Sequence, residues 1–410
     1  MTRVSGKQCY SLLAVCFFAV CVSCAGKHTA ESLTDATGVI HIDVTQERLV
    51  AEDYPLDRAV SELEYIPLET TKSCLIGRLQ DVYVIGDRLL VDDLHNLYMY
   101  DRQGKFIRSV SRRGQGPADY EYVRTVIVDP DSRVFYLIAR KKMIKYAFDG
   151  TYIETVGVSD REESHCGVMT PGRTVMFYKS NMNVFAGDIS AVISLFEMDT
   201  LGRVLRTFPN PSPRYVERRR TYTMTESPLY VYNGDICFNE FGNDTLFVLS
   251  GDTMSARMIV ALGDLKMDYN PDHSHLTPME GLALVNAETK LDFSNVWEDD
   301  RYFYIQIGIG STGVNGSHQC IYDKHANEFI CLGDGFTNTL DGGIRFFPQP
   351  GKVLPDGTKI MWKEAVEFKE EMLSTDHDIQ KAKYGERFEK VYQLALALEE
   401  DDNPVLILAK

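Results

Sequence analysis

The stretch NLYMYDRQGKFIRSV at residues 96–110 decides the fold, because its pattern returns twice further along the chain. An apolar strand is followed by a polar turn that ends in glycine, and a second apolar strand comes next. The later copies are KMIKYAFDGTYIETV at 142–156 and SLFEMDTLGRVLRTF at 194–208. In all three copies the glycine stands four residues after the last residue of the first strand. Glycine supplies the positive φ that a tight reversal requires, so we expect three β-hairpins of the same construction.

The hairpins recur at spacings of 46 and 52 residues, which is typical of a β-propeller. Propeller repeats run ~40–50 residues, and each blade is a small twisted sheet. One blade cannot cover both of its faces, whereas a ring of stacked blades buries them. Weaker copies at 245–251 and 320–331 continue the pattern, and short strands fill the chain from about 63 to 362. Six blades of about 50 residues fit this span. Seven shorter blades, or hairpins assorted in a sandwich, are the alternatives.

The expected architecture is all-β, a six-bladed β-propeller with a short inserted helix and a C-terminal helix. A capping box with proline at the first helical position predicts the inserted helix at 278–288. Apolar residues between 388 and 398 lie on one helical face, which predicts the second helix at 378–400. The Asn403-Pro404 pair ends that helix, and 405–408 is predicted to be a closing strand.

The N-terminal residues carry the features of an export signal. A basic start precedes an uncharged apolar run of 13 residues at 10–22. That run is too short for a membrane-spanning helix, which needs ~20 residues. The small residue Ser23 and then Cys24 follow the run, as in a bacterial lipobox. We therefore expect a lipoprotein signal peptide at 1–23, lipid attachment at Cys24, an N-terminal tether at 24–60 and the propeller at 61–410. An ordinary secretory signal with an incidental cysteine is the alternative.

Composition excludes some classes of protein. Apolar residues make up 44% of the chain and charged residues 25%, which is ordinary for a globular protein and argues against a disordered one. The chain carries 59 acidic and 43 basic residues, for a net charge of −16. Nucleic acid is not an expected partner, because an acidic protein is repelled by the phosphate backbone.

Several segments resemble a known family. They are LEYIPLE (63–69), GKFIR (104–108), RGQGP (113–117), DGG (341–343), FFP (346–348) and NPVLIL (403–408). With these segments the chain resembles the six-bladed β-propeller lipoproteins of Bacteroides-type Gram-negative bacteria, which are relatives of the NHL-repeat propellers. The resemblance implies a six-bladed fold and an outer-membrane lipoprotein on the periplasmic or cell-surface face. It brings no established reaction.

The loop Arg112-Arg113-Gly114-Gln115-Gly116 is the candidate ligand-binding segment. Its two glycines would let backbone N–H groups approach a ligand, and the arginine pair could hold a carboxylate or sulfate. It is not a phosphate loop, since no Lys-Ser/Thr pair follows. The alternative is a glycine-shaped connection between blades, with Arg113 tied to a neighbouring carboxylate.

No cofactor is predicted, although a divalent cation could bind. His273 and His275 are weak metal-ligand candidates, because alternate residues of an extended segment share one face. Solvated histidines are the alternative. Acidic turn residues such as Asp299, Asp334 and Asp341 could gather around a cation in the channel, and capping of turns is their alternative role.

Cys320 and Cys331 lie in a predicted hairpin. Pairing Tyr322 with Phe329 sets Cys320 opposite Cys331, so the two could form a disulfide. Cross-strand Cβ atoms at ~4.5–5.5 Å are slightly too far apart for a disulfide, which prefers ~3.8 Å. Two buried thiols are the alternative.

The function that these features predict is a monomeric, membrane-anchored binding or scaffold module for a glycan, a peptide or another envelope protein. No motif of a hydrolase triad, zinc protease or dinucleotide site is present in the sequence. The alternative is a propeller hydrolase or lyase that acts on a carbohydrate or lactone with a metal in the central channel. The fold does not distinguish a binding module from an enzyme, because propellers host both kinds of function.

Overall fold

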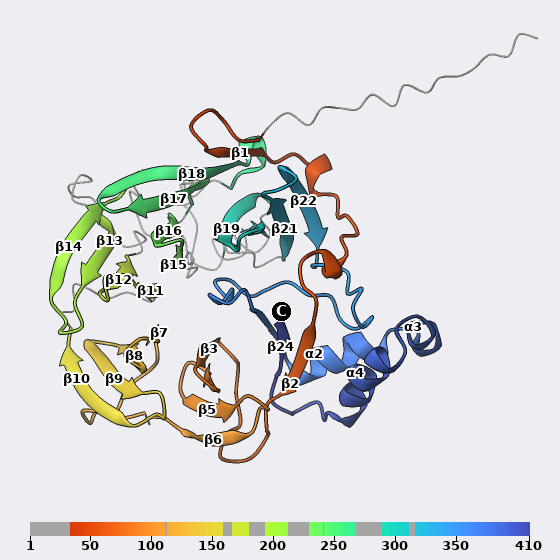
Figure 1. Cartoon of the computed structure of the whole chain (residues 1–410), viewed down its shortest axis with the longest axis horizontal. Coiled ribbons are helices and arrows are strands. Elements are labelled where there is room, and N and C mark those ends of the chain that lie inside the picture. The colour runs from red at the N-terminus through yellow and green to blue at the C-terminus, as the bar shows by residue number, and fades with distance from the viewer. Residues whose placement is uncertain are drawn as a thin grey trace, which may run out of the picture. The chain divides into compact units, whose positions relative to one another are not determined.

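Six β-sheets form a ring in the computed structural model of the chain (Figure 1). The structure describes residues 33–110, 113–158, 166–179, 193–211, 229–240, 242–267, 280, 289–310 and 316–410. The first three sheets are four-stranded, and their strands follow one another in chain order from the centre of the ring to its rim. Blade I contains β3 (Asp81–Ile85), β4 (Arg88–Asp92), β5 (Leu97–Asp101) and β6 (Phe106–Ser109); blade II contains β7 (Thr125–Asp129), β8 (Val134–Ala139), β9 (Lys142–Ala147) and β10 (Tyr152–Gly157); blade III contains β11 (Cys166–Met169), β12 (Val175–Tyr178), β13 (Ile193–Met198) and β14 (Val204–Pro209).

The other three blades vary this plan. Blade IV has a fifth strand, because β1 pairs in parallel with β18, and blade VI joins two C-terminal strands to the N-terminal strand β2. Blade IV contains β15 (Leu229–Tyr232), β16 (Asp235–Asn239), β17 (Thr245–Ser250), β18 (Thr253–Ala261) and β1 (Ile40–Asp43); blade V contains β19 (Leu291–Glu298), β20 (Tyr302–Ile309), β21 (Ser317–Asp323) and β22 (Glu328–Gly333); blade VI contains β23 (Lys359–Lys363), β24 (Val405–Ala409) and β2 (Leu63–Pro67). The predicted closing strand at 405–408 is therefore confirmed as β24, and it closes the ring by pairing with β2.

Six hydrophobic clusters hold the ring together, one between each pair of neighbouring blades. The strand β24 shows how one strand serves two interfaces, since successive side chains of a strand point to opposite faces. Val405 and Ile407 pack into the cluster between blades V and VI. Leu406 and Leu408 pack into the cluster between blades VI and I. Stacking therefore covers both faces of each sheet, which is the physical reason for a closed ring.

The predicted hairpins form the outer halves of blades I, II and III. Gly104, Gly150 and Gly202 lie in the turns between the third and fourth strands, with φ of 81°, 80° and 80°. These values confirm that the repeated glycine supplies the positive φ of the turn. The fourth strands lie at the rim and are largely exposed, whereas all six residues of β8 are buried.

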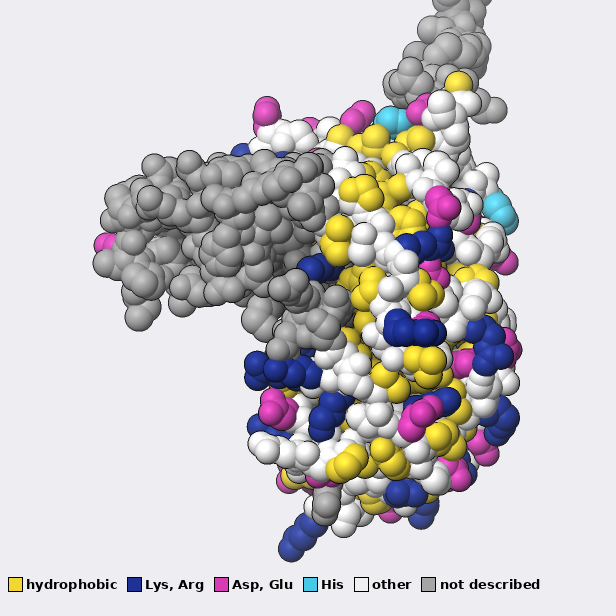
Figure 2. Space-filling view, turned by 90° about the vertical axis from the view of Figure 1, so that its left-hand side faces the viewer, with side chains coloured by type: hydrophobic (Ala, Val, Ile, Leu, Met, Phe, Trp, Pro, Cys, Tyr) yellow, Lys and Arg dark blue, Asp and Glu magenta, His cyan; other side chains and the backbone are white. Residues whose placement is uncertain are grey.

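The rim of the ring can be followed over β10 and β14 in Figure 2. Ile153 in β10 and Val204 and Leu205 in β14 are exposed. Figure 2 shows hydrophobic side chains on this side of the molecule between basic and acidic ones. Among the described residues, no helix is long and apolar enough to cross a membrane.

The described part of the expected tether lies along the rim of blades IV to VI (Figure 1). After β1 the chain forms two short 3-10 helices, η1 (Glu47–Leu49) and η2 (Leu56–Arg58), before it enters β2. On the way, the N–H of Glu52 donates to the carbonyl oxygen of Cys331 at 2.7 Å. Ile42 and Leu56 are fully buried, so burial of apolar side chains fastens this segment to the blades.

Three helices separate β23 from β24: α2 (Ala365–Leu373), α3 (His377–Tyr384) and α4 (Glu386–Ala397). The prediction of one helix at 378–400 was wrong in its extent. Gly385 divides the predicted helix, because it takes a φ of 63° between α3 and α4. The predicted apolar face is confirmed, since Phe388, Val391 and Ala395 are buried. The inserted helix predicted at 278–288 lies outside the described residues, apart from the exposed residue Glu280.

Candidate ligand-binding groove

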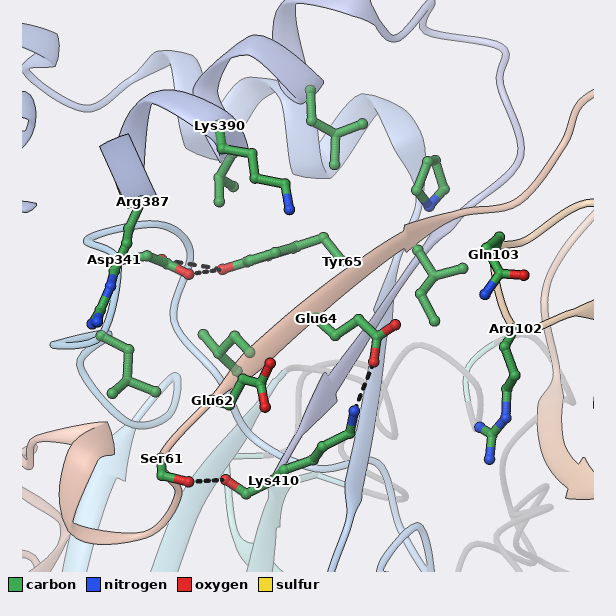
Figure 3. A pocket seen from close by; sticks show the side chains of 16 residues that line it. Ser61, Glu62, Glu64, Tyr65, Arg102, Gln103, Asp341, Arg387, Lys390 and Lys410 are labelled. Atoms are coloured by element: carbon green, nitrogen blue, oxygen red, sulfur yellow. Dashed lines mark hydrogen bonds and ion pairs between the residues drawn. The ribbon is translucent and has the colours of Figure 1, made fainter. Parts of the chain in front are cut away.

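A pocket of about 1030 Å³ lies over β2, between α4 and the β5–β6 turn (Figure 3). The strand β2 forms its floor, α4 forms one wall, and Arg102 and Gln103 of the turn form the other. We call this feature the β2 groove. Its lining residues are Ser61, Glu62, Leu63, Glu64, Tyr65, Ile66, Pro67, Arg102, Gln103, Leu340, Asp341, Arg387, Lys390, Val391, Leu394 and Lys410.

The outer edge of β2 faces this groove, since β2 pairs with β24 on its other side. The N–H of Lys410 donates to the oxygen of Glu62 at 3.0 Å, and the N–H of Glu62 donates back at 3.2 Å. In an antiparallel ladder, alternate residues turn their backbone groups toward the partner strand. Leu63 and Tyr65 therefore turn theirs away from β24, and no hydrogen bond from another described residue satisfies them.

The side chain of Tyr65 fastens the floor of the groove to the loop that ends blade V. Its hydroxyl donates to the carboxylate of Asp341, with 3.0 Å to Oδ2 and 3.2 Å to Oδ1. Asn338 Nδ2 and the N–H of Gly343 donate to Oδ1 of the same carboxylate at 2.7 and 2.8 Å. Burial raises the pKa of Asp341, and these donors oppose that effect. Asp341 is thus a structural anchor, and its bonds leave little capacity for a ligand.

The wall formed by α4 carries two basic side chains that face the groove (Figure 3). Arg387 and Lys390 are three residues apart and so lie on one side of the helix. Neither has a carboxylate oxygen within 4.0 Å among the residues that the structure describes. By contrast, Lys410 pairs with Glu64 at 2.9 Å. The lining holds four basic side chains against three acidic ones, Glu62, Glu64 and Asp341. Because Asp341 is buried and Glu64 is paired, the α4 side of the groove is its basic side, and an anionic ligand would complement it.

The predicted ligand loop lies elsewhere, between blades I and II. Its Gly114 and Gln115 line a smaller pocket of about 330 Å³ beside the β8–β9 turn. The N–H of Gly116 donates to Oδ2 of Asp119 at 2.9 Å, and a Cβ on Gly114 would lie 2.5 Å from the same oxygen. The carboxylate of Asp119 therefore fills the space beside Gly114 and Gly116, and this contact within the chain accounts for glycine at both positions. Arg113 is exposed, and Arg112 lies outside the described residues.

The predicted cysteine hairpin has the expected register. Tyr322 pairs with Phe329, and Cys320 lies opposite Cys331. Both thiols are free and buried in the structure. Burial raises the pKa of Cys320. The pKa of Cys331 is lowered to about 5, chiefly by the hydrogen bond with the thiol of Cys320 and to a smaller extent by His318.

The predicted metal ligands are not gathered together in the part of the chain that the structure describes. No group of three or more His, Cys, Asp or Glu side chains there could hold a metal ion. Asp299 pairs with Lys359 at 3.0 Å and accepts a hydrogen bond from Tyr304 at 2.7 Å. His273 and His275 lie outside the described residues, as does the predicted lipid-attachment residue Cys24.

Several buried carboxylates escaped the sequence analysis, among them Glu298 and Asp92. Glu298 is fully buried and accepts bonds from Lys324 at 2.6 Å and Arg257 at 2.7 Å, which ties blade V to blade IV. Asp92 lies directly opposite Asp81 in blade I. Burial, together with the charges of Asp81 and Asp93, raises the pKa of Asp92 to about 7. Glu298 carried no clear signal in the sequence, because β19 also contains Asp292, Ser294 and Asn295.

Comparison with models of protein families identifies the family of the chain. The model of a domain of unknown function, DUF4934, matches residues 39–410. The chain belongs to the DUF4934 family. The match begins just before β1 and runs through β24, so the DUF4934 region includes the rim segment, all six blades and the three helices. The comparison with curated proteins gave no match.

Solved structures share the fold of this DUF4934 chain. A protein from Bacteroides fragilis that is thought to be exported is 16% identical, with a TM-score of 0.66 over 91% of this chain and 99% of that one. A member of the DUF4221 family from Bacteroides vulgatus is 13% identical, with a TM-score of 0.45 over 66% of this chain and 84% of that one. A virginiamycin B lyase from Staphylococcus aureus is 9% identical, with a TM-score of 0.34 over 56% of this chain and 62% of that one. The first of these supports the six-bladed fold.

Proposed function

We propose that the chain is a binding module of the cell envelope that holds an anionic partner in the β2 groove. The observation that carries this proposal is the pair Arg387 and Lys390, which face the groove without a carboxylate partner among the described residues. Ligand pockets measure ~300–1,000 Å³, and the groove, at about 1030 Å³, reaches the upper end of that range. Hydrogen bonds from such cations to a carboxylate, sulfate or phosphate are charge-assisted and therefore strong.

In this proposal, residues 1–23 direct export and a lipid on Cys24 holds the module at the outer membrane. The apolar run at 10–22 followed by Cys24 supports this arrangement. The similar structure of a Bacteroides fragilis protein that is thought to be exported agrees with it. Because blade stacking makes the ring rigid, the module would present the groove in one fixed shape, which lowers the entropic cost of binding.

Fluorescence anisotropy with labelled probes tests the proposal. The probes are a glutamate-rich peptide, a lysine-rich peptide of equal length and an oligogalacturonate. The anionic probes are expected to bind and the lysine-rich peptide is not. Arg387→Glu combined with Lys390→Glu should weaken binding by about a hundredfold, because two charge-assisted bonds are replaced by repulsion.

A matched control changes the same charge elsewhere. Arg48→Glu combined with Lys72→Glu replaces two exposed cations outside the groove, and binding should change by less than about twofold, since exposed charges at a distance are screened. Equal binding by both double variants, or no binding of either anionic probe, would overturn the proposal.

A further inference from the structure

We infer that the anionic partner is an extended acidic peptide that adds to β2 as a further strand of blade VI. This inference rests on the proposed function and names the class of its ligand. Leu63 and Tyr65 turn their N–H and C=O groups into the groove. A peptide backbone offers donors and acceptors at the alternating spacing that such an edge requires, as in other cases of strand addition.

The dimensions of the edge limit the bound segment. The five residues of β2 span ~17 Å at ~3.4 Å per residue, which suits a peptide of about five residues. At one end Pro67 has no N–H to donate, and its carbonyl oxygen leaves no room for a side chain at Gly104 in the β5–β6 turn. The added strand would therefore bond to Leu63 and Tyr65 and stop at Pro67.

The charges on the two sides of the edge determine the preferred sequence. Side chains of a strand alternate between its faces, so residues two apart share one face. β2 turns the side chain of Tyr65 toward α4 (Figure 3). The face of the added strand on that side would meet Arg387 and Lys390. The other face would meet Glu64, Arg102 and Gln103, whose charges offset one another. Two acidic residues separated by one neutral residue complement this arrangement.

The chain already adds a strand in this way at another blade. β1 pairs in parallel with β18 at the rim of blade IV, with Ile40 opposite Met258 and Asp43 opposite Ala261. Blade IV therefore shows that an outer edge of this ring can take a further strand. In blade VI the corresponding edge is that of β2, and the described part of the chain supplies no strand to it.

Hydrogen exchange on the full chain tests the inference with the capped peptide Thr-Glu-Val-Glu-Thr as the probe. Bound peptide should slow exchange at the amides of Leu63 and Tyr65. Two further peptides carry N-methyl groups on the odd or on the even residues. Because a strand turns alternate N–H groups toward its partner, one N-methylated peptide should bind about tenfold more weakly and the other nearly as well as the parent.

The outcomes separate this inference from the proposed function. If oligogalacturonate binding depends on Arg387 and Lys390 while the peptide leaves the Leu63 and Tyr65 amides unprotected, the inference is wrong and the proposed function stands. Equal binding of both N-methylated peptides would also overturn the inference. Protection of Leu63 without peptide, together with a concentration-dependent dimer in sedimentation, would show that a second copy covers the edge. If no anionic probe binds, both proposals fail.

Discussion

The hydroxyl of Tyr65 lies 3.0 Å from Oδ2 of Asp341, although 276 positions separate the two residues in the sequence. Tyr65 belongs to β2, the partner of the closing strand β24, and Asp341 belongs to the loop between blades V and VI. Their hydrogen bond therefore joins the floor of the β2 groove to one of its sides. The ring of Tyr65 also packs edge-on against Phe368 of α2, with centroids 5.8 Å apart.

Tyr65→Phe should lower the free energy of unfolding by about 2 kcal/mol, because a buried carboxylate loses one of its donors. Urea denaturation would measure the change. Tyr152→Phe is the control, since Tyr152 is exposed on the rim strand β10, and it should leave the transition unchanged. A Tyr65→Phe variant with the wild-type midpoint would show that the bond does not contribute to stability.

Asp92 should make stability fall as pH rises from about 4 to 7. Its pKa in the folded chain is about 7, above the ordinary value of 3.8. The folded chain therefore binds more protons than the unfolded chain within this window, so stability is lost as the pH rises through it. The contribution of this one group amounts to at most about 4 kcal/mol.

Asp92→Asn should remove this pH dependence and unfold at higher urea than the wild type above pH about 7. The new amide oxygen can still accept the hydrogen bond from the N–H of Leu94, which is 2.7 Å long in the structure. Asp87→Asn, at an exposed position, serves as the control and should retain the wild-type pH profile. An Asp92→Asn variant whose stability still falls between pH about 4 and 7 would refute the assignment.

Leu406→Ala should destabilise the chain by about 3 kcal/mol, because it opens a cavity at the closure between blades VI and I. Leu406 is fully buried in β24, whereas Leu205 in β14 is 53% exposed. The same substitution at Leu205 should cost less than about 0.5 kcal/mol. Thermal unfolding of both variants would measure the difference, and equal costs would contradict a closure held by this interface.

Cys24→Ser should move the protein from the membrane fraction to the soluble fraction, because several acyl chains on one residue are needed for durable anchoring. Cell fractionation and detergent phase partitioning would follow the protein. Cys16→Ser lies inside the apolar run and should leave the protein in the membrane fraction. A wild-type protein that is soluble and carries an unmodified Cys24 would refute the lipid anchor.

Local chemistry made much of the fold predictable. The glycine of each repeat showed where the chain reverses, and the unbroken apolar run at 405–408 predicted a closing strand, which the structure buries on both faces. The hairpin that sets Cys320 opposite Cys331 also followed from residues close together in the chain. The extent of the C-terminal helices was harder to predict, because α2 has a weak apolar periodicity and depends on packing through Phe368 and Met372.

The sequence by itself determined the hairpins, the number of blades that best fits their spacing and the strand that closes the ring, since these depend on turn residues and on apolar runs of a few positions. Only the tertiary structure decided where the candidate site lies. Arg387 and Lys390 look like any exposed bases of a helix in the sequence, and Tyr65 looks like any strand tyrosine. They form one groove because closure brings the first and last strands together, and that long-range contact leaves no mark in the local pattern.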